Sequence, residues 1–123
     1  MSMHFFRSLD QILYDVEKKK DRAQREYNMY LLMCDHVRAF GVAVPLEALL
    51  PTQDGDVFKQ FEQVKRTYPG KKRFSLKERS QLRSMLRYYD LKLDYLACKA
   101  IESRGIIHEA WQAADLPSEE DLI

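Results

Sequence analysis

The chain has 123 residues, of which 46% are hydrophobic, and it carries a formal charge of +1. This length suits one domain with a real core, and the hydrophobic fraction excludes an intrinsically disordered chain. The near-neutral charge excludes a polycation that is drawn as a whole to nucleic acid or anionic lipid.

Helix breakers are absent from two long stretches, residues 1–40 and 71–104. The glycines and prolines lie elsewhere, at Gly41, Gly55, Gly70, Gly105, Pro45, Pro51, Pro69 and Pro117. Because proline costs about 3 kcal/mol inside a helix, this exclusion predicts two long helices. We therefore expect an all-α protein built on a long antiparallel helical hairpin. Its elements are helices at about 8–40 and 75–104, a short middle helix at about 54–68 and a short C-terminal helix at about 106–115.

The first helix is expected to begin at Ser8, which has the spacing of a capping box with Gln11, and to end at Gly41. Its apolar residues fall on one stripe at about 100° per residue. They are Leu9, Ile12, Leu13, Val16, Ala23, Tyr27, Tyr30, Leu31, Cys34 and Val37. A continuous helix would be about 50 Å long. This exceeds the width of such a domain, so part of it should project or meet another chain.

Between Val16 and Tyr27 the apolar stripe thins to Ala23 alone, and charged residues crowd the same turns. Pairs spaced i to i+4, such as Asp15 with Lys19, would stabilise the helix locally. We expect a solvated charged face here; the alternative is a bend or a waist in the packing.

The middle of the chain contains a linker with one helical turn and then a modest amphipathic helix. Pro45 suits a first helical position, and Pro51 ends the turn. The apolar residues of the middle helix have helical spacing. They are Val57, Phe58, Phe61, Val64 and Tyr68.

The third helix opens on a second capping box, Ser75 with Glu78. One apolar line follows at the alternating spacing of a packed seam. It comprises Leu82, Leu86, Tyr89, Leu93, Leu96 and Ala100. A second line lies almost on the opposite side, and it comprises Tyr88, Leu91, Tyr95 and Cys98. A helix that is apolar on two sides must be covered on both, either by the short helices or by another molecule. We expect Tyr88, Leu91 and Tyr95 to form a protein interface.

The last predicted helix follows Gly105, and Trp111 is expected to anchor it on the core because large aromatic side chains dominate core energetics. We expect residues 1–116 to form a single helical domain. Residues 117–123 read as an acidic, solvated tail.

The two cysteines, Cys34 and Cys98, each lie inside a helical stretch among apolar neighbours. We expect both to be buried free thiols, which suits a reducing compartment. The sequence has no apolar run near the roughly 20 residues of a membrane span and no signal-peptide pattern at its start. These observations predict a cytoplasmic protein with no membrane partner.

No pattern of catalytic or metal-binding residues emerges. The histidines at positions 4, 36 and 108 lie in three different elements, without the i to i+4 pairing of a helical metal site. Cys34, Asp35 and His36 are adjacent, but neighbouring helical residues point about 100° apart and cannot converge on one ion. We therefore expect no enzyme activity, no cofactor and no metal.

A basic segment at residues 71–87 is the candidate anion-binding or nucleic-acid-binding site. Its residues are Lys71, Lys72, Arg73, Arg79, Arg83 and Arg87. The first three precede a capped helix N-terminus, which favours anions, and the arginines form an i to i+4 ladder. Asp90 and Asp94 continue the same side with the opposite sign, which weakens this interpretation. The alternative is a solvated basic face, balanced by the acidic tail or by carboxylates of the first helix.

The sequence thus predicts a non-enzymatic helical interaction module, such as an adaptor, chaperone, inhibitor or assembly subunit. Its partner would be another protein or a second copy, which allows a homodimer. The other hypothesis is a nucleic-acid-binding protein that uses the basic segment.

Overall fold

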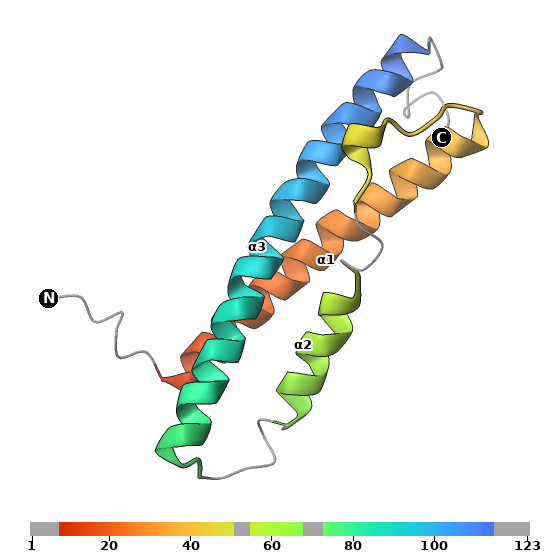
Figure 1. The fold of residues 1–123 in the computed structure, drawn as a ribbon. Coiled ribbons are helices and arrows are strands. Elements are labelled where there is room, and N and C mark those ends of the chain that lie inside the picture. Colours follow the sequence, from red (N-terminus) through yellow and green to blue (C-terminus); the bar gives the residue numbers. More distant parts are fainter. Residues whose placement is uncertain (1–7, 51–54, 68–72, 115–123) are drawn as a thin grey trace, which may run out of the picture.

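The computed structural model describes residues 8–50, 55–67 and 73–114, and every regular element within these ranges is helical. In chain order they are α1 (Leu9–Ala39), the short 3-10 helix η2 (Leu46–Ala48), α2 (Asp56–Thr67) and α3 (Leu76–Ala113). The two long helices pack along each other, and the short middle helix lies beside them (Figure 1). The predicted all-α class and the predicted long and middle helices are confirmed.

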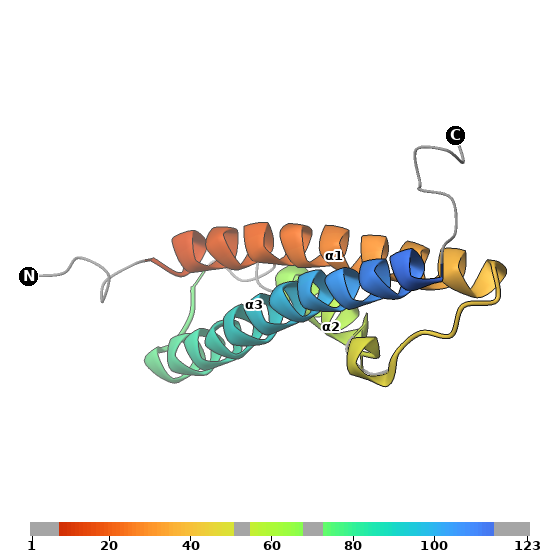
Figure 2. The same cartoon turned by 90° about the horizontal axis from the view of Figure 1, so that it is seen from above.

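The two long helices run in the same direction, as Figures 1 and 2 show. Lys19, early in α1, bonds Asp90 and Asp94 in α3. His36, near the end of α1, stacks on Trp111 near the end of α3, with ring centroids 5.0 Å apart. The early part of α1 thus contacts the earlier part of α3, and its end contacts the end of α3. The two helices are therefore parallel, and the predicted antiparallel orientation is wrong.

The short middle helix explains this orientation, because it supplies one of the two chain reversals. Lys20 of α1 pairs with Glu62 of α2, while the earlier Glu17 pairs with the later Lys65, so α2 runs against α1. A second reversal after α2 then turns α3 back into the direction of α1. Helices in series that each reverse leave the first and third parallel.

The helix ends follow the predicted signals. The Ser8 hydroxyl accepts a hydrogen bond from the Gln11 backbone N–H at 3.1 Å, although the Gln11 side chain donates to Asp15 and does not close the capping box. At the start of α3, Ser75 and Glu78 form the complete box. Gly41 after α1 has a φ of 77°, the left-handed conformation that ends a helix.

The last helix of the chain is not a separate element. The structure continues α3 through Gly105 to Ala113, so the predicted break at this glycine is wrong. Glycine inside a helix costs roughly 1 kcal/mol relative to alanine. The burial of Ile107 and Trp111 beyond it outweighs that cost, since each large apolar side chain contributes about 1.5–3 kcal/mol. Trp111 anchors this end on the core, as predicted.

The core consists of two clusters arranged along α1 and α3. The first lies between all three α-helices and contains Val16, Ala23, Val57, Phe58, Phe61, Leu86, Tyr89, Leu93, Leu96 and Ala97. The second lies where η2 packs between the later parts of α1 and α3, and it contains Tyr30, Cys34, Val37, Ala48, Ala100, Ile107 and Trp111. The Tyr30 hydroxyl also accepts a hydrogen bond from the Leu50 N–H at 3.1 Å, which ties the segment after η2 to α1.

The charged turns of α1 contribute ion pairs that join the helices. Ala23 lies among these turns and is fully buried in the core cluster that the three α-helices share. Lys19 bonds Asp90 and Asp94 at 2.8 and 2.7 Å, and Glu26 pairs with Arg104 farther along α3. The charged face of α1 was predicted to be solvated. Several of its charged residues instead make ion pairs with the other helices.

Candidate functional site

The two apolar lines of α3 have opposite environments. Leu86, Leu93 and Leu96 of the first line are fully buried. On the opposite side, Tyr88, Leu91 and Tyr95 are 55%, 62% and 54% exposed. These three residues and Cys98 make up what we call the outer stripe. No described segment of the chain covers it.

The outer stripe is extended by a thiol and bordered by charges. Cys98 is exposed, so the prediction that it is buried is wrong, whereas Cys34 is buried as expected; both are free thiols. Cys98 lies on the side of α3 that faces away from the core, and no described neighbour packs over it. The Lys92 ammonium lies over the Tyr95 ring, 5.7 Å from its centroid, and draws a positive charge to the stripe.

The basic segment is described only in part. Lys71 and Lys72 lie outside the described residues. Arg73 and the ladder Arg79, Arg83 and Arg87 are exposed on α3 and just before it.

The acidic residues that follow the ladder are engaged by α1. The hydrogen bonds of Lys19 to Asp90 and Asp94 raise the pKa of the Lys19 ammonium. One lysine therefore balances part of the charge of two carboxylates at the end of the ladder. The exposed side chains of Arg79, Arg83 and Arg87 still form a positive surface, on a part of α3 that does not face the core.

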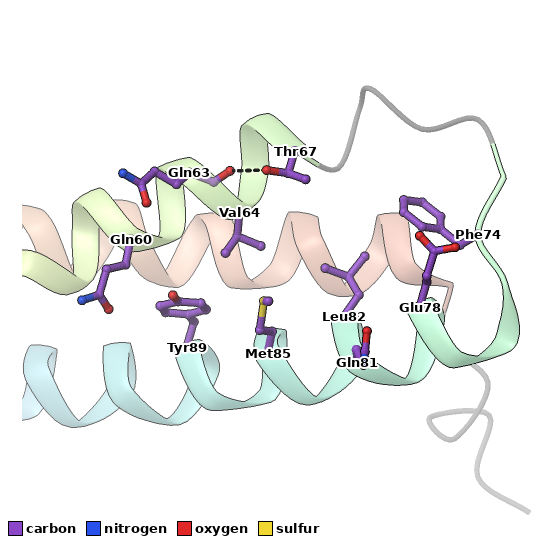
Figure 3. Close-up of a pocket in the computed structure, with 10 residues that line it drawn as sticks. All are labelled: Gln60, Gln63, Val64, Thr67, Phe74, Glu78, Gln81, Leu82, Met85 and Tyr89. Atoms are coloured by element: carbon purple, nitrogen blue, oxygen red, sulfur yellow. Dashed lines mark hydrogen bonds between the residues drawn. The ribbon is translucent and has the colours of Figure 1, made fainter.

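A groove that sequence reasoning missed lies between α2 and α3 (Figure 3). Its volume is about 420 Å³. The residues that line it are Gln60, Gln63, Val64 and Thr67 from α2, Phe74 just before α3, and Glu78, Gln81, Leu82, Met85 and Tyr89 from α3. Two helices and a loop contribute, so only their placement in space brings the lining together.

The groove has an apolar floor and amide walls. Val64, Leu82 and the 46%-exposed Met85 form its open apolar surface, beside the buried Tyr89. Tyr89 packs against Phe61 with ring centroids 5.8 Å apart, and burial raises the pKa of its phenol. Gln60 and Gln63 project from α2, and Gln81 projects from α3 (Figure 3). The one sequence signal was Met85, an apolar residue of α3 that belongs to neither predicted line.

A second hollow, of about 350 Å³, lies on the other side of α2 and is mainly polar. Lys20 and Glu62 pair across it at 3.0 Å, and this hydrogen bond lowers the pKa of the Glu62 carboxyl. Lys59 and Arg66 also line it, so the outer side of α2 is basic.

Neither metal ligands nor a membrane span is found in the part of the chain that the structure describes. The histidine, cysteine and acidic side chains there form no group of three that could hold a metal ion. None of the described helices combines the length and apolar character needed to cross a bilayer.

Comparison of the chain with known proteins found no similar protein. No family model matches the chain, and neither the curated proteins nor the solved structures gave a match.

Proposed function

We propose that this protein is a non-enzymatic helical interaction module that binds another protein, or a second copy of itself, through the outer stripe. The observation that carries the proposal is the exposure of Tyr88, Leu91 and Tyr95, each by more than half, along one side of a long helix. Contiguous exposed apolar side chains on a soluble domain mark interaction sites more often than scattered ones do.

The stripe suits a docking role because its helix is already ordered. The opposite side of α3 is anchored by Leu86, Leu93 and Leu96, so a partner would not need to fold the surface that it binds. Burial of apolar area contributes about 25 cal/mol per Å². Tyrosine also adds a hydroxyl at the edge of such an interface, which is one reason it is enriched among the residues that dominate binding.

Replacement of Leu91 by aspartate tests the proposal. The matched control is Leu32→Asp, since Leu32 is 68% exposed on α1, outside the outer stripe. Sedimentation velocity over a range of concentrations would detect self-association. Affinity capture from the native host, followed by binding assays with the purified partner, would detect another protein. We expect Leu91→Asp to abolish the association that is found and Leu32→Asp to preserve it.

Two results would refute the proposal. One is a chain that stays monomeric and captures no partner. The other is an association that Leu91→Asp and Leu32→Asp leave equally strong. Circular dichroism of both variants would establish that neither has lost its helices.

We also propose that the protein is cytosolic. The exposed free thiol of Cys98 supports this location, because exposed thiols persist in reducing compartments.

The second candidate function is nucleic-acid binding by the basic segment. The observation in its favour is the exposure of Arg79, Arg83 and Arg87 on consecutive turns of α3. Binding to a duplex or single-stranded probe should then weaken steeply with salt. A triple replacement of these arginines by alanine should remove it, and an unchanged titration would discard this function.

A further inference from the structure

The outer stripe is the middle of a longer exposed line on α3. The positions along this line alternate in spacing between four and three residues, which is the spacing of a helix that packs lengthwise on another helix. All of them are exposed, and we call them the extended stripe. They are Lys77, Gln81, Ser84, Tyr88, Leu91, Tyr95, Cys98, Glu102, Gly105 and Glu109.

Charge is distributed unevenly along the extended stripe. Lys77 lies near its beginning, the apolar residues lie in the middle, and Glu102 and Glu109 lie toward its end. A line that is basic at one end and acidic at the other is complementary to a reversed copy of itself. We propose that the occupant of the outer stripe is a second copy of this chain, whose α3 packs antiparallel on the first α3. This inference rests on the function proposed for the stripe and adds the partner and its orientation.

A twofold axis between Leu91 and Tyr95 sets each position of the extended stripe opposite a different position of the second copy. The large apolar side chains at the centre then meet a leucine or a small thiol, and the polar residues meet one another farther out. The facing pairs are Leu91 with Tyr95, Tyr88 with Cys98, Gln81 with Gly105, Ser84 with Glu102 and Lys77 with Glu109. The arrangement therefore joins opposite charges at both ends and places no charge among the apolar pairs.

A parallel pair of the same helices is disfavoured by its charges. In that orientation each residue of the extended stripe faces its own copy. Lys77 would meet Lys77, and both Glu102 and Glu109 would meet glutamate. Like charges set against each other oppose such a pairing.

Four charged residues beside the outer stripe form two borders. They are Lys92 and Lys99 on one side, and Arg87 and Asp94 on the other. In an antiparallel pair each border meets the same border of the second copy, so the lysines repel while Arg87 and Asp94 attract. Asp94 also bonds Lys19 at 2.7 Å, and Lys99 lies 3.8 Å from Glu102 of its own helix. The two borders oppose each other, so the facing pairs of the extended stripe determine the orientation.

Sedimentation velocity of the full chain tests whether the pair forms. Only four apolar residues per copy enter the contact, so we expect a weak dimer that dissociates on dilution. The mass should be twice the 14.6 kDa of one chain at high concentration and should fall to that of one chain at low concentration.

Charge reversal at the ends tests the antiparallel orientation. Lys77→Glu should raise the dissociation constant about fivefold or more, because it makes two attractive pairs in each dimer repulsive. The double variant Lys77→Glu and Glu109→Lys should restore the natural dissociation constant. Arg79→Glu is the matched control, since Arg79 is exposed but points about 160° away from Lys77 around the helix, and it should have no effect.

A crosslink tests the register. Tyr88→Cys places a thiol opposite the natural Cys98 of the second copy, so mild oxidation should give a covalent dimer on a non-reducing gel. Adding Cys98→Ser to this variant should abolish the crosslink. The natural chain should not crosslink, because its two Cys98 residues would lie about 15 Å apart along the helix axis.

The outcomes separate this inference from the function on which it rests. A chain that stays monomeric while its outer stripe binds another protein would refute the homodimer and leave the proposed function standing. A chain that does neither would refute both. A dimer that Lys77→Glu does not weaken, or that Glu109→Lys does not rescue, would contradict the antiparallel orientation. Oxidative crosslinking of the natural chain through Cys98 alone would contradict the register.

Discussion

The two sides of α3 carry similar apolar patterns, but one side is buried in the core and the other is exposed. Leu93 on one side is fully buried, whereas Leu91, two positions earlier, is 62% exposed. Both lines have the alternating spacing of three and four residues. The difference is made by the rest of the chain, because α1, α2 and η2 all pack on the same side of α3. Periodicity identifies a helix and its apolar lines, but the other elements decide which line becomes core.

Truncation of one leucine from each side gives the largest expected contrast. Leu93→Ala should lower the free energy of unfolding by about 2–5 kcal/mol, because it removes fully buried methyl groups and leaves a cavity. Leu91→Ala should change it by no more than about 0.5 kcal/mol. Urea unfolding followed by circular dichroism measures both. Equal losses would show that the outer stripe is covered in solution.

Enlargement of a buried alanine tests how tightly the core side is packed. Ala23→Leu should cost about 1–3 kcal/mol, because Ala23 is fully buried in the core and the added methyl groups would overpack it. Ala113→Leu, at an exposed position in the last turn of α3, is the control and should be nearly neutral. Thermal unfolding would compare them. A neutral Ala23→Leu would mean that the packing around Ala23 is looser than its complete burial indicates.

Two glycines should respond with opposite signs. Gly105→Ala should stabilise the protein by about 0.5–1 kcal/mol, because this glycine lies inside α3. A Cβ added there meets no atom of the described chain within 4 Å. Gly41→Ala should destabilise it by about 1 kcal/mol, because a φ of 77° disfavours a side chain. If Gly105→Ala destabilises, the outer end of α3 is not a regular helix in solution.

Alkaline titration gives the smallest effect. Burial raises the pKa of Tyr89, so the folded chain holds this proton more tightly than the unfolded chain, whose tyrosines titrate near 10.0. The corresponding stability is complete below that pH and is lost as the pH rises toward the folded pKa. Tyr89→Phe should therefore lose less stability above pH 10.0 than the natural chain does. Unfolding free energies on both sides of this pH would reveal the difference, and identical slopes would contradict it.

The individual helices and most of their ends could be predicted because their signals are local. Ser75 and Glu78 are three residues apart, and the cap they form depends on nothing else in the molecule. The parallel direction of α1 and α3 could not be read in this way, because it depends on whether α2 reverses the chain. The helix break predicted at Gly105 was wrong for a related reason. The low helix propensity of glycine is local, and the burial of Trp111 farther along α3 outweighs it.

The two candidate surfaces differ in the same respect. The outer stripe belongs to one helix, so the spacing of Tyr88, Leu91 and Tyr95 found it, although its exposure depended on where the other helices pack. The α2–α3 groove needs Val64 and Met85 to face each other from two elements. The spacing of residues along the chain does not predict that these two side chains line the same groove.

The parallel packing of the long helices has a consequence for how the chain folds. The bonds from Lys19 to Asp94 and from Arg104 to Glu26 span 75 and 78 residues. Helical proteins usually fold fast because their contacts are local, whereas distant contacts require closure of long loops first. This protein should therefore form its helices first and dock α3 onto α1 as a late step of folding.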